Sequence, residues 1–223
     1  MKQDKKARSE DLEGSKRPHG GRPTLKEAEQ LHGRILDVAT ELFTKHGYGE
    51  TSIEAIAASA GIGKLTLYRR FGDKDALFQA VALRMSEQSR SAMAAIGENN
   101  QNPSDALTEA GSFLLNVVLS PQSVAFHRIV FSEAARLPEL CASMHQDAPS
   151  DRGHPIRRII LRFAEQGVLD INDVDFLTHQ FVQAVIGNPL RKALLGGPPM
   201  SAQARQDHVR KTVALFLRGA VRD

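Results

Sequence analysis

The first part of the chain carries a hydrophobic pattern with the period of an α-helix. Over residues 26–46, apolar side chains recur three and four positions apart with charged residues between them, at Ile35, Ala39, Leu42 and Phe43. Gly47 ends this pattern. Two short segments follow, at 53–60 and 64–71, separated by the Gly-Ile-Gly of 61–63. We therefore expect one longer helix and then two short helices joined by a tight turn.

The helical period continues through the rest of the chain, mostly in longer segments. Asp73 is placed to cap a helix over 74–96, which carries an apolar stripe at Leu77, Val81 and Met85. Thr51 and Ser52 are expected to cap the helix at 53–60, and Glu54 stands three residues after Thr51, which is the spacing of a capping box. After a polar loop at 97–103, the pattern predicts helices over 104–119, 121–147, 154–167, 173–187 and 201–219.

No segment alternates as a β-strand does, so we expect an all-α fold of about nine helices. Residues 1–25 lack periodicity and are rich in charge, Gly and Pro, so a disordered basic arm is expected there. A three-helix domain is expected at 26–73. A C-terminal helical bundle is expected at 74–223, with 74–97 as the connecting helix.

Composition narrows the class of protein. The arm holds seven Lys and Arg against four Asp and Glu, while the whole chain has a formal net charge of +3. The single cysteine, Cys141, excludes an intrachain disulfide and fits a reducing cytosol. Met1 opens a charged stretch, and the apolar run at 113–119 is too short to span a membrane. We therefore expect a cytoplasmic protein without a membrane partner.

Neither a metal site nor a catalytic centre emerges from the residue pattern. The eight histidines are scattered, and no two of them have the i, i+4 spacing of a helical zinc site. No cluster of nucleophile, base and acid is apparent, and no Gly-rich phosphate loop follows a strand. We expect no metal, no cofactor and no enzyme activity.

The segment at 64–71 has the chemistry of a helix that contacts nucleic acid. Between Ile62 and Lys74 there are four basic residues and one acidic residue. Hydroxyl and basic side chains near a helix start suit contacts to phosphates and base edges. A generic helical hairpin produces the same apolar pattern, so the basic residues carry the argument for a helix-turn-helix.

The stretch from Thr51 to Phe78, TSIEAIAASAGIGKLTLYRRFGDKDALF, resembles the signature of the TetR family of transcriptional regulators. The upstream ATELFTKHGY of 39–48 belongs to the same signature, and the LYRRF block followed by Lys-x-x-Leu is its most specific part. The resemblance covers about residues 28–88. Ser132–Leu140, SEAARLPEL, is similar to C-terminal domains of the AefR-like branch.

The resemblance implies DNA contacts for individual residues. It implies that Tyr68 binds a phosphate, that Lys64 and Thr66 lie at base edges, and that Arg69 reaches a phosphate or a base. Lys74 would meet a phosphate beside the start of the next helix. The full set of implied DNA-binding residues is Arg22, Thr51, Ser52, Lys64, Leu65, Thr66, Tyr68, Arg69 and Lys74.

Three positions add to this interpretation or depart from it. Gly63 stands where the family usually has a hydroxyl residue, and Leu65 stands where a small residue is usual. The operator sequence therefore cannot be transferred from relatives. Arg22, in a Gly-Arg-Pro tripeptide, suits entry into the minor groove, whose negative potential attracts cations.

The C-terminal helices carry apolar residues on more than one side, which indicates burial on several faces. A plain bundle core and a bundle with a ligand cavity both fit this pattern. For a cavity that takes a largely apolar small molecule, we expect the lining Phe113, Asn116, Val117, Phe126, His127, Val130, Phe163 and Gln183. For a homodimer interface, as the family resemblance implies, we expect Leu177, Phe181, Val185, Val209, Val213, Phe216 and Leu217.

The sequence thus predicts a homodimeric, ligand-responsive regulator that leaves a palindromic double-stranded operator when a small molecule binds. An activator, or a regulator without a ligand, remains an alternative. An all-α enzyme or protein-interaction bundle, whose basic helix meets another anionic partner, is an alternative from a different class.

Overall fold

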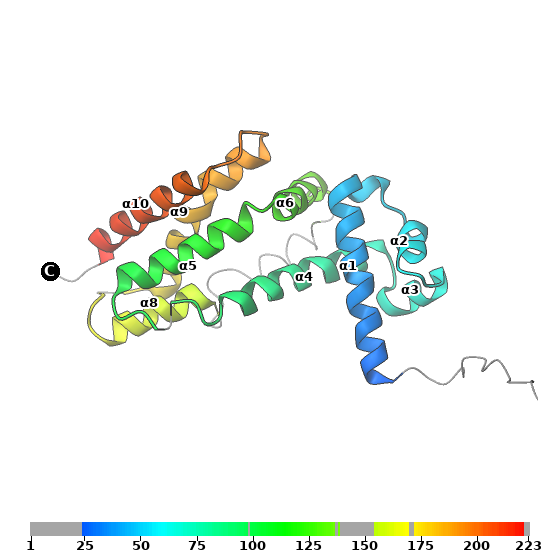
Figure 1. Cartoon of the computed structure of the whole chain (residues 1–223), viewed down its shortest axis with the longest axis horizontal. Helices are drawn as coiled ribbons and strands as arrows, with labels where there is room; N and C mark the ends of the chain where they lie inside the picture. Colours follow the sequence, from blue (N-terminus) through cyan, green and yellow to red (C-terminus); the bar gives the residue numbers. More distant parts are fainter. Residues whose placement is uncertain (1–23, 98, 137, 139–153, 170–171, 221–223) are drawn as a thin grey trace, which may run out of the picture.

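The computed structural model describes residues 24–97, 99–136, 138, 154–169 and 172–220. The prediction of an all-α fold is confirmed for these residues. The helices, labelled as in Figure 1, are α1 (Leu25–Glu50), α2 (Ile53–Ser59), α3 (Lys64–Phe71), α4 (Lys74–Met93), α5 (Pro103–Val118), α6 (Pro121–Glu133), α8 (Pro155–Glu165), α9 (Val174–Leu194) and α10 (Ala202–Ala220).

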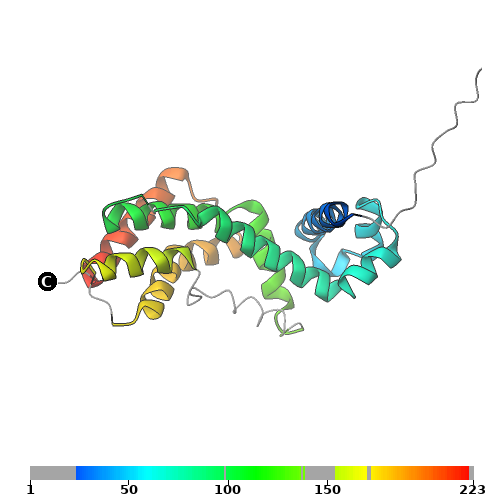
Figure 2. The same ribbon diagram turned by 90° about the horizontal axis from the view of Figure 1, so that it is seen from below.

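The molecule is elongated, with the short helices α2 and α3 at one end. Helix α4 runs from that end into a bundle formed by α5, α8, α9 and α10 (Figure 1). The last turns of α10 lie at the end of the molecule opposite to α2 and α3, as the turned view confirms (Figure 2). Helix α6 lies between α5 and α1, where the two parts of the molecule meet.

Polar side chains cap the helix starts. Asp73 caps α4, as predicted, by accepting a hydrogen bond from the backbone N–H of Ala76 at 2.8 Å. The predicted capping box of Thr51 and Glu54 is wrong, because Ser52 is the N-cap residue and its Oγ accepts from the N–H of Ala55. A capping box that the sequence analysis missed starts α1, where Thr24 and Glu27 exchange side-chain and backbone hydrogen bonds.

Helix ends differ from the sequence expectation at three places. Helix α6 ends at Glu133 and is followed by turns at 134–136, whereas the pattern predicted one helix over 121–147. Gly47 leaves the helical conformation with φ at 85°, as expected of a stop signal, but the chain resumes helical turns up to Glu50. Helix α9 continues to Leu194 instead of ending near 187, with Pro189 inside it. Proline has no N–H to donate to the carbonyl four residues earlier, which belongs to Val185. Nε2 of His208 on α10 hydrogen-bonds to that carbonyl at 2.9 Å, so a side chain from another helix replaces the missing donor.

Two hydrophobic cores hold the helices together. The first unites α1 to α4, and its fully buried side chains include Ile35, Phe43, Leu67, Leu77 and Phe78. The second unites α5, α8, α9 and α10 with the end of α4 at Met93. Each core gives its helices a partner for their apolar stripe, which is the main source of helix stability in water.

Helix α6 contributes to the first core although it follows α5 in sequence. Phe126, Ile129 and Val130 are buried there against the helices of the N-terminal part. Arg128, on the other side of α6, donates hydrogen bonds to the carbonyls of Ala193 and Leu194 at the end of α9, at 2.7 and 3.3 Å. Helix α6 therefore touches both the N-terminal helices and the C-terminal bundle.

Candidate nucleic-acid interface

Helices α2 and α3 are joined by a turn that fixes their mutual orientation. Gly61 adopts φ of 67° there, in the left-handed region that glycine occupies without strain. The backbone N–H of Ile62 closes the turn on the carbonyl of Ala57 at 2.9 Å. The half-buried Ile62 and the fully buried Leu67 pack into the first core. The arrangement of two short helices across a tight turn is that of a helix-turn-helix.

The outer face of α3 is exposed and basic. Lys64, Tyr68 and Arg69 are exposed, while Thr66 and Arg70 are half-buried. Leu65 is also on this face, with 63% of its surface exposed. Leu67 is the one residue of α3 that is fully buried. One face of α3 thus holds the helix in the core and the other presents cations and hydroxyls to solvent.

The two aromatic residues of α3 have different places. Tyr68 lies on the surface, 39% exposed, with Nζ of Lys64 at 5.5 Å from its ring centroid. Phe71 is half-buried and stacks on His32 of α1, with ring centroids 5.1 Å apart. Tyr68 therefore lies on the surface, and Phe71 packs against α1, which agrees with the expectation that Phe71 is a core aromatic.

Lys64 is engaged by an acid from α2. The carboxylate of Glu54 forms an ion pair and hydrogen bond with Nζ of Lys64, and both side chains are exposed. The hydrogen bond lowers the pKa of Glu54 and raises the pKa of Lys64. Glu54 was expected in a helix cap, so the pair was not predicted, although the single acid of α2 and the bases of α3 are visible in the sequence.

The expectation that Thr51 touches DNA is corrected by its burial. Thr51 is 3% exposed, and its hydroxyl donates hydrogen bonds to the carbonyls of Gly47 at 2.7 Å and Leu42 at 3.2 Å. Its role is to tie the end of α1 to the start of α2. Ser52 is exposed beside it, and its hydroxyl accepts the cap hydrogen bond of α2.

Lys74 is half-buried near the end of α1. Its Nζ donates to the carbonyl of Gly49 at 3.3 Å and lies 4.3 Å from the ring centroid of Tyr48. Burial, and then the neighbouring Arg136, lower the pKa of Lys74. The Tyr48 hydroxyl donates to the carboxylate of Asp75, and burial followed by this carboxylate raises the pKa of Tyr48. Lys74 thus joins α1 to α4 at the edge of the basic face.

Two further positions concern the same face. Gly63, the N-cap of α3, has φ of −74° and open space where a Cβ would lie, so the backbone does not require glycine there. The departure from the family pattern at this position therefore has no steric cause. Arg22 and the rest of the N-terminal arm lie outside the described residues.

Two family models match the chain, one over its N-terminal helices and one over its C-terminal helices. Residues 35–81 match the model described as bacterial regulatory proteins, tetR family, and residues 105–219 match the AefR-like transcriptional repressor, C-terminal domain. The second match alone covers just over half of the chain. The chain belongs to the TetR family. The resemblance of Ser132–Leu140 to the AefR-like branch is confirmed by the second match.

Individual relatives agree with this assignment. The transcriptional regulator UidR of Escherichia coli K12 is 40% identical over 63 residues, which cover 28% of this chain and 32% of UidR. The chain thus spans about a third of the length of this curated relative. A TetR-family regulator structure from Mesorhizobium loti has a TM-score of 0.81 at 21% identity and covers 87% of this chain and 98% of its own. The flavonoid-responsive regulator FrrA has a TM-score of 0.71 at 24% identity over 86% of this chain and 98% of its own.

No single described helix of this TetR-family chain is long and apolar enough to cross a membrane. Among the described helices, the one pair that has the combined length and composition, α5 with α6, is bent by 67° at the break between them.

The residues expected to line one ligand cavity are not brought together. Phe126 and Val130 are buried in the first core, whereas Phe163 is buried in the second core. Of the remaining residues, Phe113, Val117 and His127 are half-buried, and Asn116 and Gln183 are exposed. Apolar residues of α6 pack in the first core, and apolar residues of α5 pack in the second core. The sequence pattern shows only that these faces are buried, so it suggested one shared cavity.

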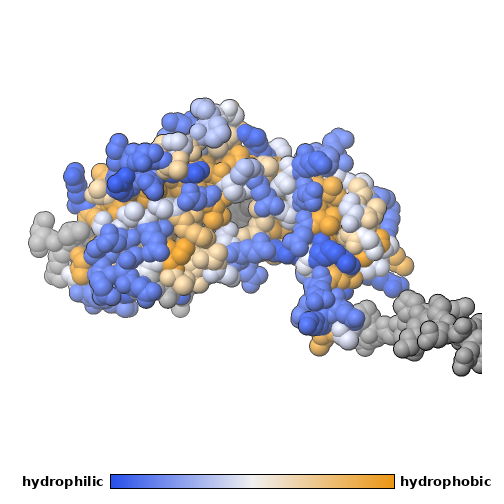
Figure 3. Space-filling model, viewed as in Figure 1, coloured by the Kyte–Doolittle hydropathy of each residue, from blue (hydrophilic) through white to orange (hydrophobic). Residues whose placement is uncertain are grey.

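Most of the residues expected at the dimer interface are enclosed within one protomer. Phe181, Val185, Val209 and Val213 are at most 1% exposed, because α9 and α10 pack on each other and on α5. These four therefore do not form a surface on which a partner docks, which corrects that part of the expectation. Leu177, Phe216 and Leu217 are half-buried. Hydrophobic residues do gather on the surface over α5, α9 and α10 (Figure 3).

Proposed function

We propose that this TetR-family regulator is a cytoplasmic homodimeric repressor, not an enzyme, that binds a palindromic operator and leaves it when a small molecule occupies the C-terminal bundle. The exposed basic face of α3 on a helix-turn-helix carries this proposal. Lys64, Tyr68 and Arg69 provide phosphate and base-edge contacts, with Ser52, Leu65, Thr66 and Lys74 around them. Arg22 would add a minor-groove contact.

A dimer follows from the proposed operator. Two recognition helices that are one helical turn of DNA apart read the two halves of a palindrome, and a twofold axis relates them. The outward side of α9 and α10 carries exposed apolar residues at Phe176 and Leu215, which supports a pairing surface there.

Release by a ligand requires a connection between the two parts of the chain. Helix α6 offers one, because Phe126 lies in the core of the helix-turn-helix part while Arg128 holds the end of α9. A ligand that prefers one position of α6 shifts the population of DNA-binding conformers, provided that its affinities for the two conformers differ. The name of the structural relative FrrA, a flavonoid-responsive regulator, supports ligand control.

The first test is a salt-titrated gel shift with the DNA upstream of the protein's own gene. We expect a specific shift whose affinity falls steeply with salt, since phosphate contacts release counterions. A monomer at micromolar concentration that shifts no DNA would refute the proposal.

A binding-site selection separates the roles of Tyr68 and Lys64. Tyr68→Phe should weaken binding to all sequences alike, because a phosphate contact carries no base information. Lys64→Ala should instead relax preference at one half-site position, at a cost of about 1–3 kcal/mol. A changed preference in Tyr68→Phe, or an unchanged preference in Lys64→Ala, contradicts the assigned role.

A further inference from the structure

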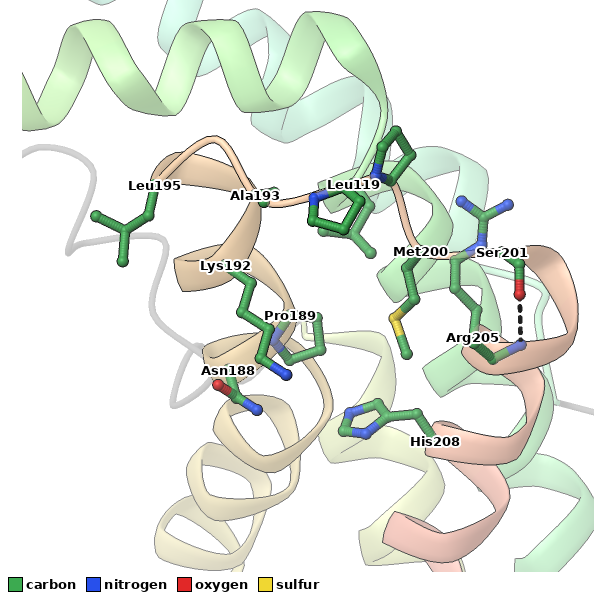
Figure 4. Close-up of a pocket in the computed structure, with 14 residues that line it drawn as sticks. Leu119, Asn188, Pro189, Lys192, Ala193, Leu195, Met200, Ser201, Arg205 and His208 are labelled. Atoms are coloured by element: carbon green, nitrogen blue, oxygen red, sulfur yellow. Dashed lines mark hydrogen bonds between the residues drawn. The ribbon is translucent and has the colours of Figure 1, made fainter.

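A cavity of about 800 Å³ opens between α9 and α10, next to the end of α5 (Figure 4). None of the eight residues expected from the sequence to bind a ligand lines it. Its apolar lining includes Leu119, Pro189 and Met200. The side chains of Met200 and His208 point into the space between the two helices. The volume lies within the range of small-molecule sites.

The charged side chains that line this cavity are the cations Lys192 and Arg205. Asn188, Ser201 and His208 add polar atoms, and no carboxylate lines the cavity among the residues that the structure describes. Nε of Arg205 is buried without a hydrogen-bond partner. A buried guanidinium N–H normally has an acceptor, so an acceptor from outside the chain would satisfy it. Ser201 caps the start of α10 at the same wall, where the helix dipole also favours negative charge.

The wall of the cavity is fixed by the backbone. The N–H of Gly197 hydrogen-bonds to the carbonyl of Lys192 at 2.9 Å, and a Cβ at Gly197 would lie 2.9 Å from that oxygen. Pro198 and Pro199 follow and limit the backbone further. The loop between α9 and α10 is therefore held against α9, which favours a preformed site.

We propose that this cavity binds a small amphipathic carboxylate, with the carboxylate at Arg205 and the apolar body against Leu119, Pro189 and Met200. This proposal rests on the proposed function, because the bound carboxylate is the effector that releases the operator. Ala193 lines the cavity, and its carbonyl accepts the hydrogen bond from Arg128 of α6. A ligand that displaces the end of α9 thus acts on the helix that also packs in the first core.

The probe for the site is 4-phenylbutyrate, with its methyl ester as the uncharged counterpart, titrated by calorimetry into the full-length protein. We expect the acid to bind about tenfold more tightly than the ester, as a charge-assisted hydrogen bond implies. Arg205→Gln should lose about the same factor for the acid. The control Arg210→Gln removes the same charge from an exposed α10 residue that pairs with Asp207, and it should bind as the wild type does.

A tryptophan reporter locates the bound probe, because the chain has no tryptophan of its own. Met200→Trp places the indole in the cavity, into which the Met200 side chain points (Figure 4), and Leu25→Trp places it on an exposed residue at the start of α1. We expect 4-phenylbutyrate to change the emission of the first variant and leave that of the second unchanged. Equal binding of acid and ester, wild-type affinity in Arg205→Gln, or no response at position 200 would overturn the proposal.

Operator binding is measured separately, with and without 4-phenylbutyrate, so that failure of this inference is distinguishable from failure of the proposed function. Loss of specific DNA binding in the absence of probe refutes the proposed function. With the probe, operator affinity should fall in the wild type. It should stay unchanged in Arg128→Gln, which should keep its affinity for the probe. An operator affinity that the bound probe leaves unchanged in the wild type overturns the assignment of this site to the effector.

Discussion

Phe126 of α6 stacks on Phe78 of α4, with ring centroids 5.0 Å apart and ring planes inclined by 23°. Phe78 also meets Phe43 edge-on at 5.0 Å, so the contact lies inside the core of the helix-turn-helix part. A residue from the C-terminal half of the chain thus completes the core of the N-terminal part. The position of α6 and the packing of α4 are consequently linked by direct contact.

We expect Phe126→Ala to lower the free energy of unfolding by about 3–5 kcal/mol, because it removes a buried ring and leaves a cavity. Urea denaturation measures this loss. Phe131→Ala is the matched control, because Phe131 is on the same helix but 65% exposed. Similar losses in the two variants would show that the stacked ring is not part of the core in solution.

Glu54→Gln should strengthen DNA binding, and most of all to sites that carry the base that Lys64 contacts. The substitution breaks the ion pair that holds Lys64 and removes a negative charge beside α3. With Lys64 free to reach the DNA, the slope of log affinity against log salt should become steeper by about one unit. Fluorescence anisotropy at several salt concentrations measures both effects. Glu165→Gln, at the exposed end of α8, is the control for the change in net charge. An equal gain in DNA affinity in that variant would show that the Glu54–Lys64 ion pair does not limit DNA binding.

The hydrogen bond from His208 to the carbonyl of Val185 predicts a coupling with Pro189. His208→Ala leaves that buried carbonyl without a donor, which should cost about 1–3 kcal/mol of unfolding free energy. In a Pro189→Ala background, the new alanine has an N–H that can donate to the same carbonyl, so His208→Ala should cost less. Denaturation of the four proteins of this double-mutant cycle measures the coupling. Additive effects would mean that His208 does not replace the donor that Pro189 lacks.

His32 predicts a pH dependence of stability. Its burial against Phe71, and then the positive charges of Arg70 and Arg84, lower its pKa from the ordinary 6.5. Below about pH 6.5 the unfolded chain therefore takes up a proton at this position more readily than the native chain does. The contribution of neutral His32 to the free energy of unfolding is fully present above that pH. It is lost as the pH falls through the lowered pKa of His32 in the native state.

Urea denaturation at pH 7.5 and 5.5 tests the sign. The wild type should lose more unfolding free energy between these two values than His32→Gln does. His46→Gln, at an exposed histidine of the same helix, should behave as the wild type. A smaller loss of unfolding free energy in the wild type than in His32→Gln would mean that the pKa of His32 is raised in the native state.

The sequence by itself determined the helices and the face of α3 that meets solvent. Helical periodicity depends on neighbours three and four residues apart, so Leu67 and Leu77 were recognisable as core positions and Lys64 and Arg69 as surface positions. The breaks at Gly47 and 61–63 and the cap at Asp73 are equally local. The TetR-type motif is contiguous, so the family and the helix-turn-helix also followed from the sequence.

The tertiary structure decided which apolar faces meet. Periodicity shows that a face is buried but not against what, so Phe126 and Phe163 were expected in one cavity and lie in two cores. For the same reason, Val185 and Val209 were expected between protomers and are buried within one. The cavity at Arg205 unites the loop after α9 with the start of α10 and the end of α5. Its residues share no local pattern, because long-range packing alone brings them together.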